Sequence, residues 1–380
     1  MRLQLRAALL FGFALAVPSA LAIAQEGDWT VTIDALGYTD TNATQVVTPQ
    51  AGVSRALDAD GGAISARFTV DAISSASVDV VSHATQGFGE VRYQADLAAS
   101  KRFGDYLPAL TYRFSLEPDY ESHGAGLSLQ SRLGTPDSVL AVGYNFSHDI
   151  VSRSGSSNDA FSARLLSHRA DLSYTQTLSM RSLIRGAYTM TAQNGYMEKP
   201  YRHVPLFRTG TGSGAGFDNF DALRLPTRPL ENVPDTRLRH ALAVRFLHFI
   251  PSADVTLKID YQFYFDDWSL TAHTVEPRVA WQVSEHVELG LWLRAYRQSG
   301  ASFWRRTYEV PNVATVPQFR SADRDLSPYT AGTVGLRTAW QNERWGVYVE
   351  GSVVQTFFDD FLYLDSLTAV IVQTGLRFTP

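Results

Sequence analysis

Charged residues that alternate with apolar ones are the first candidates for chemistry in this sequence. They fall at every second position of several segments, which would place them on the inner face of a barrel. The predicted inward-facing set is Arg92, Asp96, Arg169, Asp171, Arg245, Lys258, Asp260, Glu288, Arg294, Arg337, Glu350 and Arg377. Either these charges form ion pairs that fill the barrel, or they line a water-filled pore and select its solutes. We favour the pore, because a barrel of about 16 strands leaves room for a channel.

Two long segments between predicted strands carry a second set of candidates. Positions 193–236 contain Tyr201, Arg202 and His203, and positions 299–328 contain Arg305, Arg306, Asp323, Arg324 and Asp325. Mixed charge with aromatic residues suits a loop that folds into a barrel as a constriction, and it suits binding of a polar ligand equally well. The third interpretation is a solvated outer loop that contacts lipopolysaccharide. The glycine-rich run at 209–216 lacks the Lys-Ser/Thr that ends a phosphate-binding loop.

Residue patterns for catalysis or metal binding are weak. The chain has no cysteine, which excludes disulfides, thiolate metal sites and a cysteine nucleophile. No HExxH or GxSxG motif occurs, and the Ser284-Glu285-His286 triplet has no evident third residue to orient a base. The acidic pairs Asp266-Asp267 and Asp359-Asp360 could share a hard cation, although a solvated rim is the simpler interpretation. We therefore predict no enzyme, cofactor or metal, with a membrane-embedded hydrolase as the weaker alternative.

Strands must position the charged residues. In the segment 254–265, one face carries Val255, Leu257, Ile259, Tyr261, Phe263 and Phe265, and the other carries Asp254, Thr256, Lys258, Asp260, Gln262 and Tyr264. Because successive side chains of a strand point to opposite faces, this segment is predicted to be a strand with one apolar and one polar face. About a dozen residues are what a tilted strand needs to cross a bilayer.

The same pattern recurs along the chain and predicts a transmembrane antiparallel up-and-down β-barrel of about 16 strands (14–16). The predicted strands are 29–38, 45–57, 62–74, 89–103, 107–117, 121–132, 137–150, 167–178, 181–192, 237–249, 254–266, 273–283, 286–298, 329–341, 345–358 and 366–379. Short turns and longer loops alternate between them, as in outer-membrane barrels, where the short turns are periplasmic. A soluble sandwich could also alternate, but it gives little reason for this asymmetry of the loops.

The beginning and the composition of the chain indicate export to a membrane. Residues 1–24 are predicted to be a cleaved secretory signal, with Arg2 and Arg6 before an apolar run and Ala22-Ile23-Ala24 at the cleavage site, which leaves 25–380 as the barrel. Aromatic residues make up 12 % of the chain, which suits the aromatic girdles of an outer-membrane barrel. The formal net charge of −5 argues against a nucleic-acid partner. We expect outer-membrane lipid and lipopolysaccharide as the surroundings.

The last predicted strand carries a more specific signal. Gln373-Thr374-Gly375-Leu376-Arg377-Phe378 resembles the terminal signal by which outer-membrane barrels are handed to their assembly machinery. Thr379-Pro380 stands where a final aromatic residue is usual. The resemblance implies the barrel-assembly machinery as a partner.

Several stretches resemble an uncharacterised family of bacterial outer-membrane β-barrels, a domain of unknown function. The stretches run from Val70-Asp71-Ala72-Ile73 to Ser82-His83-Ala84-Thr85, and include Pro200-Tyr201-Arg202-His203-Val204-Pro205, Pro234-Asp235-Thr236-Arg237, Asp266-Asp267-Trp268, Ala272-His273-Thr274 and Ala322-Asp323-Arg324-Asp325-Leu326-Ser327. The resemblance implies the fold and the membrane location, and no catalytic residues. It also implies a setting with flavin transferases and small lipoproteins, and therefore a periplasmic or lipoprotein partner.

Three functions stay open from the sequence. The first is a porin-like channel or transport protein for small polar or charged solutes. The second is a non-conducting scaffold for electron-transfer or maturation partners, with the barrel plugged by 193–236. The third is the hydrolase at Ser284 and His286.

Overall fold

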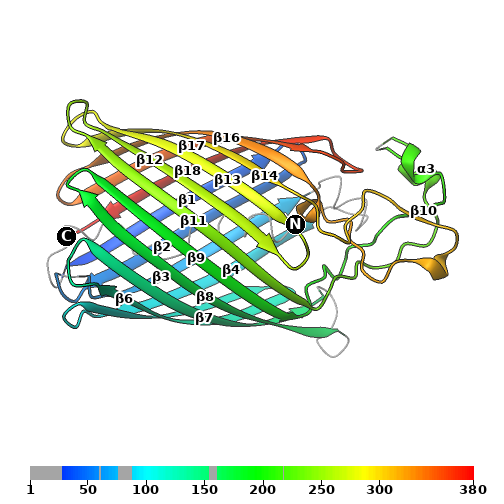
Figure 1. Cartoon of the computed structure of the whole chain (residues 1–380), viewed down its shortest axis with the longest axis horizontal. Helices are drawn as coiled ribbons and strands as arrows, with labels where there is room; N and C mark the ends of the chain where they lie inside the picture. Colours follow the sequence, from blue (N-terminus) through cyan, green and yellow to red (C-terminus); the bar gives the residue numbers. More distant parts are fainter. Residues whose placement is uncertain (1–27, 60, 76–87, 154–160, 217) are drawn as a thin grey trace.

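The computed structural model is a closed barrel of sixteen antiparallel strands (Figure 1). It describes residues 28–59, 61–75, 88–153, 161–216 and 218–380, so the predicted signal at 1–24 and the stretch 82–85 lie outside the described residues. The barrel strands are β1 (Trp29–Asp40), β2 (Thr44–Ala56), β3 (Ala63–Ser75), β4 (Phe88–Ser100), β5 (Tyr106–Glu117), β6 (Tyr120–Arg132), β7 (Ser138–Ser152), β8 (Ser162–Ser179), β9 (Ser182–Gly195), β11 (Thr236–Ile250), β12 (Val255–Asp266), β13 (Thr271–Gln282), β14 (Val287–Gln298), β16 (Tyr329–Gln341), β17 (Trp345–Phe358) and β18 (Ser366–Phe378).

Each of the sixteen predicted strands corresponds to one strand of the barrel, so the predicted fold is confirmed. Each strand pairs with its neighbours along the chain, and β18 pairs with β1 to close the sheet. Closure gives every described strand of the barrel a hydrogen-bonded neighbour on each side, as a lipid environment requires. The largest difference in boundary is at β8, which begins at Ser162 rather than at 167.

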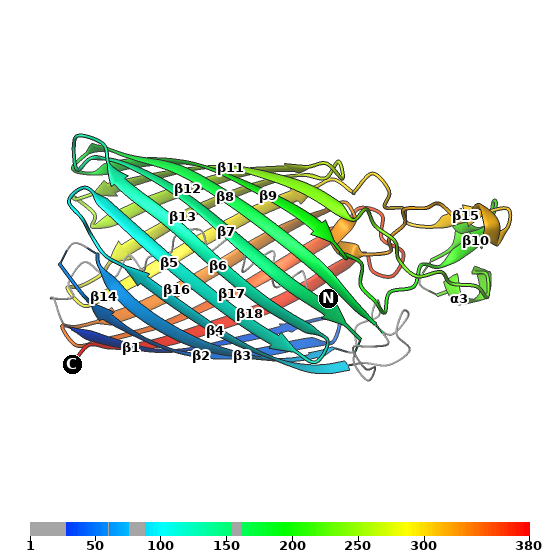
Figure 2. The ribbon, with the colours of Figure 1, turned by 90° about the horizontal axis from the view of Figure 1, so that it is seen from below.

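The two rims of the barrel differ, as predicted. Short turns join the strands at the rim where β1 begins and β18 ends, and we call this the short-turn rim. The loops 196–235 and 299–328 extend from the other rim, the long-loop rim, and lie near the barrel axis in both views (Figures 1 and 2). They contain the short strands β10 (Leu206–Arg208) and β15 (Tyr308–Val310) and a helical turn, α3 (Phe220–Leu223). Within the described residues, no helix is long and apolar enough to span a membrane.

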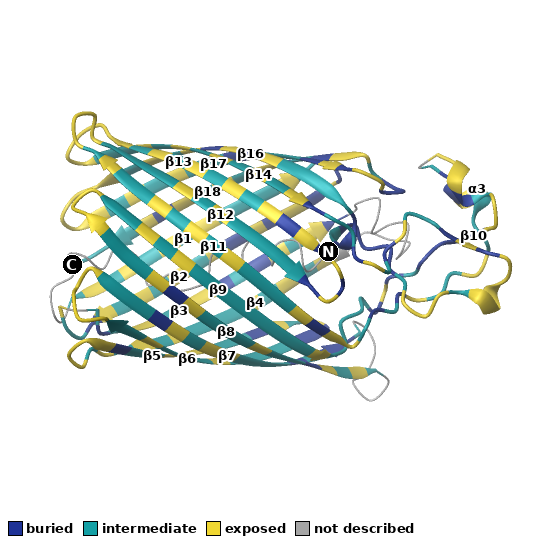
Figure 3. Ribbon diagram, viewed as in Figure 1, coloured by how far each residue is buried: buried dark blue, intermediate teal, exposed yellow. Residues whose placement is uncertain are grey.

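The outward face of the barrel is apolar and exposed, and it alternates along each strand with a less exposed inward face (Figure 3). Ile259, Leu291 and Leu336 are 50 %, 44 % and 63 % exposed. An apolar surface of this extent on the outside of a protein marks contact with lipid.

A repeated aromatic arrangement lies on the outward face in the half of the barrel next to the long-loop rim. In each copy a tyrosine hydroxyl bonds the Nδ1 atom of a histidine on the next strand, at 2.7–2.9 Å. The pairs are Tyr112–His123, Tyr144–His168, Tyr188–His240 and Tyr261–His273. Rings with an apolar body and a polar tip suit the boundary between lipid tails and headgroups.

Candidate functional site

Ion pairs cover the inward face of the barrel and follow its wall. Arg245 Nε lies 2.6 Å from Asp260 Oδ1, and Arg113 Nε lies 2.5 Å from Asp96 Oδ1. Further pairs are Arg92–Asp71, Arg169–Asp171, Lys258–Asp260 and Arg337–Glu350. Each of these pairs joins residues of one strand or of two hydrogen-bonded strands. These side chains therefore pair along the wall rather than across the barrel.

The structure places the twelve predicted inward-facing residues on that wall. Nine of them belong to the ion pairs above, and Glu288, Arg294 and Arg377 share the inward face by register, opposite Ala339, Thr333 and Gly346. The inward face carries further charges that were not predicted: Asp71, Arg113, Arg185, Glu276 and Arg278. The alternation of side chains along β3, β5, β9 and β13 is the sequence signal that places them there, as it does for the charges of β12.

Several of these inward-facing charges have solvent-accessible side chains. The side chains of Arg245 and Asp260 are 43 % and 25 % exposed, and that of Arg113 is 35 % exposed. Charges that filled the interior of a barrel would be close to fully buried. The exposure therefore indicates solvent-accessible space beside this part of the wall.

Loops 196–235 and 299–328 form a folded unit at the long-loop rim, which we call the loop cap. Strand β10 pairs in parallel with β15, so residues about a hundred positions apart lie side by side. Val204, Leu206, Tyr308 and Val310 are almost fully buried between the two loops. Burial of these apolar side chains gives the cap a core of its own.

A buried cluster of charges holds the two loops together. Arg202 pairs with Asp323, and Lys199 Nζ lies 2.8 Å from Asp323 Oδ2. Arg202 also lies 3.7 Å from Glu231, which accepts a hydrogen bond from the Ser321 hydroxyl. The side chains of Arg202, Glu231 and Asp323 are all buried. Buried charges persist only when they are paired, so the cluster specifies how the loops pack.

The cap is anchored to the barrel on more than one side. The Tyr201 hydroxyl donates to Asp119 in the β5–β6 turn at 2.9 Å. The Gln298 side chain at the end of β14 donates to the carbonyl oxygens of Asp325 and Ser327, at 2.9 and 2.7 Å. Because β5 and β14 are well separated around the barrel, the cap extends over part of the barrel mouth.

Two of the stretches that carry the family resemblance meet at the long-loop rim. Arg237, which begins the inward face of β11, pairs with the buried Asp266 and lies over the Trp268 ring at 4.1 Å. The Trp268 indole donates to the carbonyl oxygen of Thr236 at 3.0 Å. Asp266 is therefore a structural residue rather than part of a solvated acidic rim.

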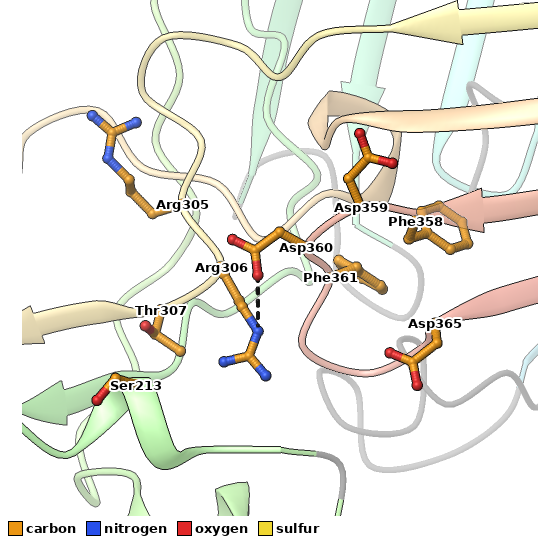
Figure 4. Close-up of a pocket in the computed structure, with 9 residues that line it drawn as sticks. All are labelled: Ser213, Arg305, Arg306, Thr307, Phe358, Asp359, Asp360, Phe361 and Asp365. Carbon is orange, nitrogen blue, oxygen red and sulfur yellow. Dashed lines mark ion pairs between the residues drawn. The ribbon is translucent and has the colours of Figure 1, made fainter.

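A polar cavity of about 620 Å³ lies between the cap and the β17–β18 loop (Figure 4). Arg306 Nε lies 3.2 Å from Asp360 Oδ1, while Arg305 bonds the backbone carbonyls of Ser302 and Trp304. Asp359 and Asp365 are the other acidic residues of the lining. The full lining is Ser213, Arg305, Arg306, Thr307, Phe358, Asp359, Asp360, Phe361 and Asp365. Its mixed charge provides sites for polar groups of both signs.

The predicted loop residues therefore separate into two groups. Arg305 and Arg306 line the cavity, whereas Arg202, Asp323, Arg324 and Asp325 are enclosed by the cap. His203 Nδ1 bonds the carbonyl oxygen of Arg228 at 2.9 Å, and Tyr201 anchors the cap. The long sequence separation of these partners, such as Glu231 and Ser321, left no local signal from which to predict the cluster.

The Ser284 and His286 pair lies in the exposed turn between β13 and β14, on the short-turn rim. The contact between them is a backbone one, from the His286 N–H to the Ser284 hydroxyl at 3.4 Å. A serine nucleophile needs its hydroxyl bonded to the imidazole that takes its proton. This geometry does not supply that bond.

Mild acid is expected to leave the cap closed. Burial raises the pKa of the Asp323 carboxyl, but Arg202 and Lys199 outweigh it and hold that pKa well below its usual range. The stability from this depressed pKa is present above about pH 3.9 and is lost only as the pH falls through the folded-state value. Burial and the adjacent Asp323 raise the pKa of Asp325, so as the pH falls Asp325 takes up a proton before Asp323 does, and that proton removes a repulsion between the two carboxylates.

The measurement is amide hydrogen exchange of residues 199–204 and 320–327 at pH 7 and pH 5, corrected for the intrinsic rate. We expect equal or stronger protection at pH 5. Loss of protection at pH 5 would contradict the assignment of Asp323 as the ionised centre of the cluster.

Comparison with solved structures supports the fold alone. The chain resembles a protein described as "Bacterial polysaccharide outer membrane secretin" with a TM-score of 0.51 and 8 % identity, over 92 % of this chain and 97 % of that one. It matches outer-membrane expressed OmpT of Vibrio cholerae with a TM-score of 0.44 and 9 % identity, over 93 % and 97 % of the two chains. No curated protein matches the chain.

The family comparison is more specific. The model described as "Protein of unknown function (DUF3570)" matches residues 79–350, which is well over half of the chain. The matched region contains the loop cap and the Arg237–Asp266 ion pair between β11 and β12, where two of the resembling stretches meet. The chain belongs to this family of proteins of unknown function, DUF3570, and it has the fold of an outer-membrane barrel.

Proposed function

We propose that the protein is a porin-like channel of the outer membrane for small polar or charged solutes. The observation that carries the proposal is the exposure of inward-facing charges such as Arg245 and Arg113, which pair along the wall and leave solvent-accessible space beside them. A barrel of sixteen strands is wide enough for an aqueous channel. The apolar outer face supports a location within lipid.

In this proposal the loop cap narrows the entrance and the wall charges act on the solute beyond it. Arg305 and Arg306, together with Asp359, Asp360 and Asp365, present both signs of charge in the cavity beside the cap. Solutes with polar or ionised groups gain charged and hydrogen-bonding contacts there. No step of chemistry is needed, so we propose a protein that is not an enzyme.

A planar bilayer with the folded, detergent-purified protein tests the channel. We expect stepwise currents in potassium chloride, with single-channel conductance that rises with salt concentration. Heat-modifiable mobility on a gel provides the control that the inserted protein is a folded barrel. A folded barrel that inserts but carries no current would overturn the channel.

The packed cap favours one other candidate, a non-conducting barrel that presents the cap to a partner protein. Val204 and Leu206 are fully buried and give the cap an apolar core, which a folded binding module needs. The bilayer experiment separates the two candidates, since the scaffold predicts no current from a folded barrel.

A further inference from the structure

Four basic side chains gather on one part of the barrel wall, on β9, β11, β12 and β13. Arg185 stands directly opposite Arg245, and Lys258 stands directly opposite Arg278. Like charges placed directly opposite one another destabilise a sheet. We call these four residues the basic patch. Its two adjacent like-charged pairs destabilise the folded barrel unless another interaction offsets their repulsion.

The carboxylates of the wall only partly compensate the basic patch. Asp260 lies 2.6 Å from Arg245 and 2.9 Å from Lys258, so one carboxylate serves two cations. Glu276 lies 3.6 Å from Arg278, beyond the distance of a good charge-assisted hydrogen bond. A third carboxylate, Asp171, also acts on Arg185, but it is itself bonded by Arg169. Among the described residues, Asp260 and Glu276 are therefore the two acids in ion pairs with these four bases, which leaves an excess of positive charge.

Arg185 is the least compensated member of the patch. Its Nη2 atom donates to the Ser173 hydroxyl at 3.1 Å, and its buried Nε atom has no hydrogen-bond partner among the described residues. The Nε atom of Arg278 is likewise buried and has no hydrogen-bond partner among the described residues. A buried N–H without a partner carries a free-energy penalty that an acceptor oxygen would remove.

Solutes in the lumen can reach the patch. The side chains of Arg245 and Arg278 are 43 % and 29 % exposed although both lie on the inward face. A guanidinium presents several N–H donors in a plane, which matches the spacing of oxygens in a phosphate or a carboxylate. An anionic oxygen group would therefore supply both the missing charge and the missing acceptors.

We propose that the basic patch of Arg185, Arg245, Lys258 and Arg278 is a binding site for phosphate or carboxylate groups of solutes inside the barrel. It deepens the proposed channel by naming anionic solutes as its substrates. The binding itself needs only an accessible lumen, so it is measured separately from conduction.

Calorimetric titration of inorganic phosphate into the folded, detergent-purified protein tests the site. We expect binding by the natural protein, and binding about tenfold or more weaker for Arg185→Gln and for Lys258→Gln, since a hydrogen bond to a charged group contributes roughly 1.5–3 kcal/mol. Arg113→Gln is the matched control, because Arg113 also faces inward but pairs with Asp96 on another part of the wall. The variants should fold, since each removes the repulsion from the base directly opposite, and in Lys258→Gln the Asp260 carboxylate keeps its contact with Arg245.

Two outcomes would overturn the site: no phosphate binding by the natural protein, or a loss of binding in Arg113→Gln as large as in Arg185→Gln. The reversal potential of the channel in a potassium chloride gradient provides a second test, because it measures the preference for chloride over potassium. A preference for chloride that falls in Arg185→Gln supports the site, and a preference that does not change overturns it. Phosphate binding without any current would overturn the channel and leave the site standing.

Discussion

Asp323→Asn is expected to unfold the loop cap while the barrel remains intact. The substitution leaves Arg202 and Lys199 in a buried position without the carboxylate that both contact. Removing one partner of a buried ion pair costs about 3–5 kcal/mol, because the remaining charge is uncompensated. The remaining acids of the cluster do not replace it, since Glu231 lies 3.7 Å from Arg202 and Asp325 lies 4.0 Å from Lys199.

Two measurements report on this change. Amide exchange in residues 199–204 and 320–327 should accelerate by several orders of magnitude, while exchange in the barrel strands stays slow. Single-channel conductance should rise, because the cap that extends over the mouth is released. The exchange measurement stands even if the natural protein carries no current.

Asp221→Asn is the matched control. Asp221 also pairs with an arginine of the cap, Arg224, but its side chain is 70 % exposed. Surface pairs of this kind contribute at most about 1 kcal/mol, so exchange and conductance should stay near those of the natural protein. Equal behaviour of Asp323→Asn and Asp221→Asn would show that the buried cluster does not hold the cap closed.

The barrel could be predicted from the sequence because its two environments act on every strand. Lipid on one side and the lumen on the other give segments such as 254–265 a regular alternation that a short window reveals. The turn lengths then fixed which ends of the strands share a rim. Neither argument requires knowledge of distant contacts.

The cap could not be predicted in the same way. Its parallel pair joins Leu206 to Tyr308, and its bridge between Asn232 and Arg320 spans a similar distance in sequence. Residues such as Arg202 and Asp323 therefore appeared as candidates for ligand binding, although the structure uses them to pack one loop against the other. A charge in a long loop gives no sign of whether its partner is solvent, a solute or another loop.

The charges of the barrel wall could be predicted from the sequence in part, better than the contacts of the cap but less completely than the strands. The alternation placed Arg245 and Lys258 on the inward face, but the partners of each depend on the register between strands. The opposition of Arg185 and Arg245 arises from that register. The repulsion between these bases, and therefore the basic patch, can be recognised only when the register of the paired strands is known.

Ile259→Arg is expected to block assembly of the barrel, whereas Gln262→Arg on the same strand is expected to be tolerated. Ile259 is 50 % exposed on the outward face near the middle of β12. An arginine facing lipid near the middle of the membrane costs roughly 2–4 kcal/mol, which is a large part of the stability of an ordinary domain. Gln262 faces inward and lies opposite Ala243 and Thr274, whose small side chains leave room for a longer one.

The fraction of folded protein, read from heat-modifiable gel mobility after refolding into lipid, measures both variants. We expect little folded Ile259→Arg and near-normal folded Gln262→Arg. Gly290→Arg would be a poorer control although it also faces inward, because position 290 lies directly opposite Arg337 and like charges placed opposite one another destabilise a sheet. Equal folding of Ile259→Arg and Gln262→Arg would mean that the apolar face of β12 does not contact lipid. The channel, its wall charges and the basic patch would then lose their common basis, since all three depend on which face of each strand is turned inward.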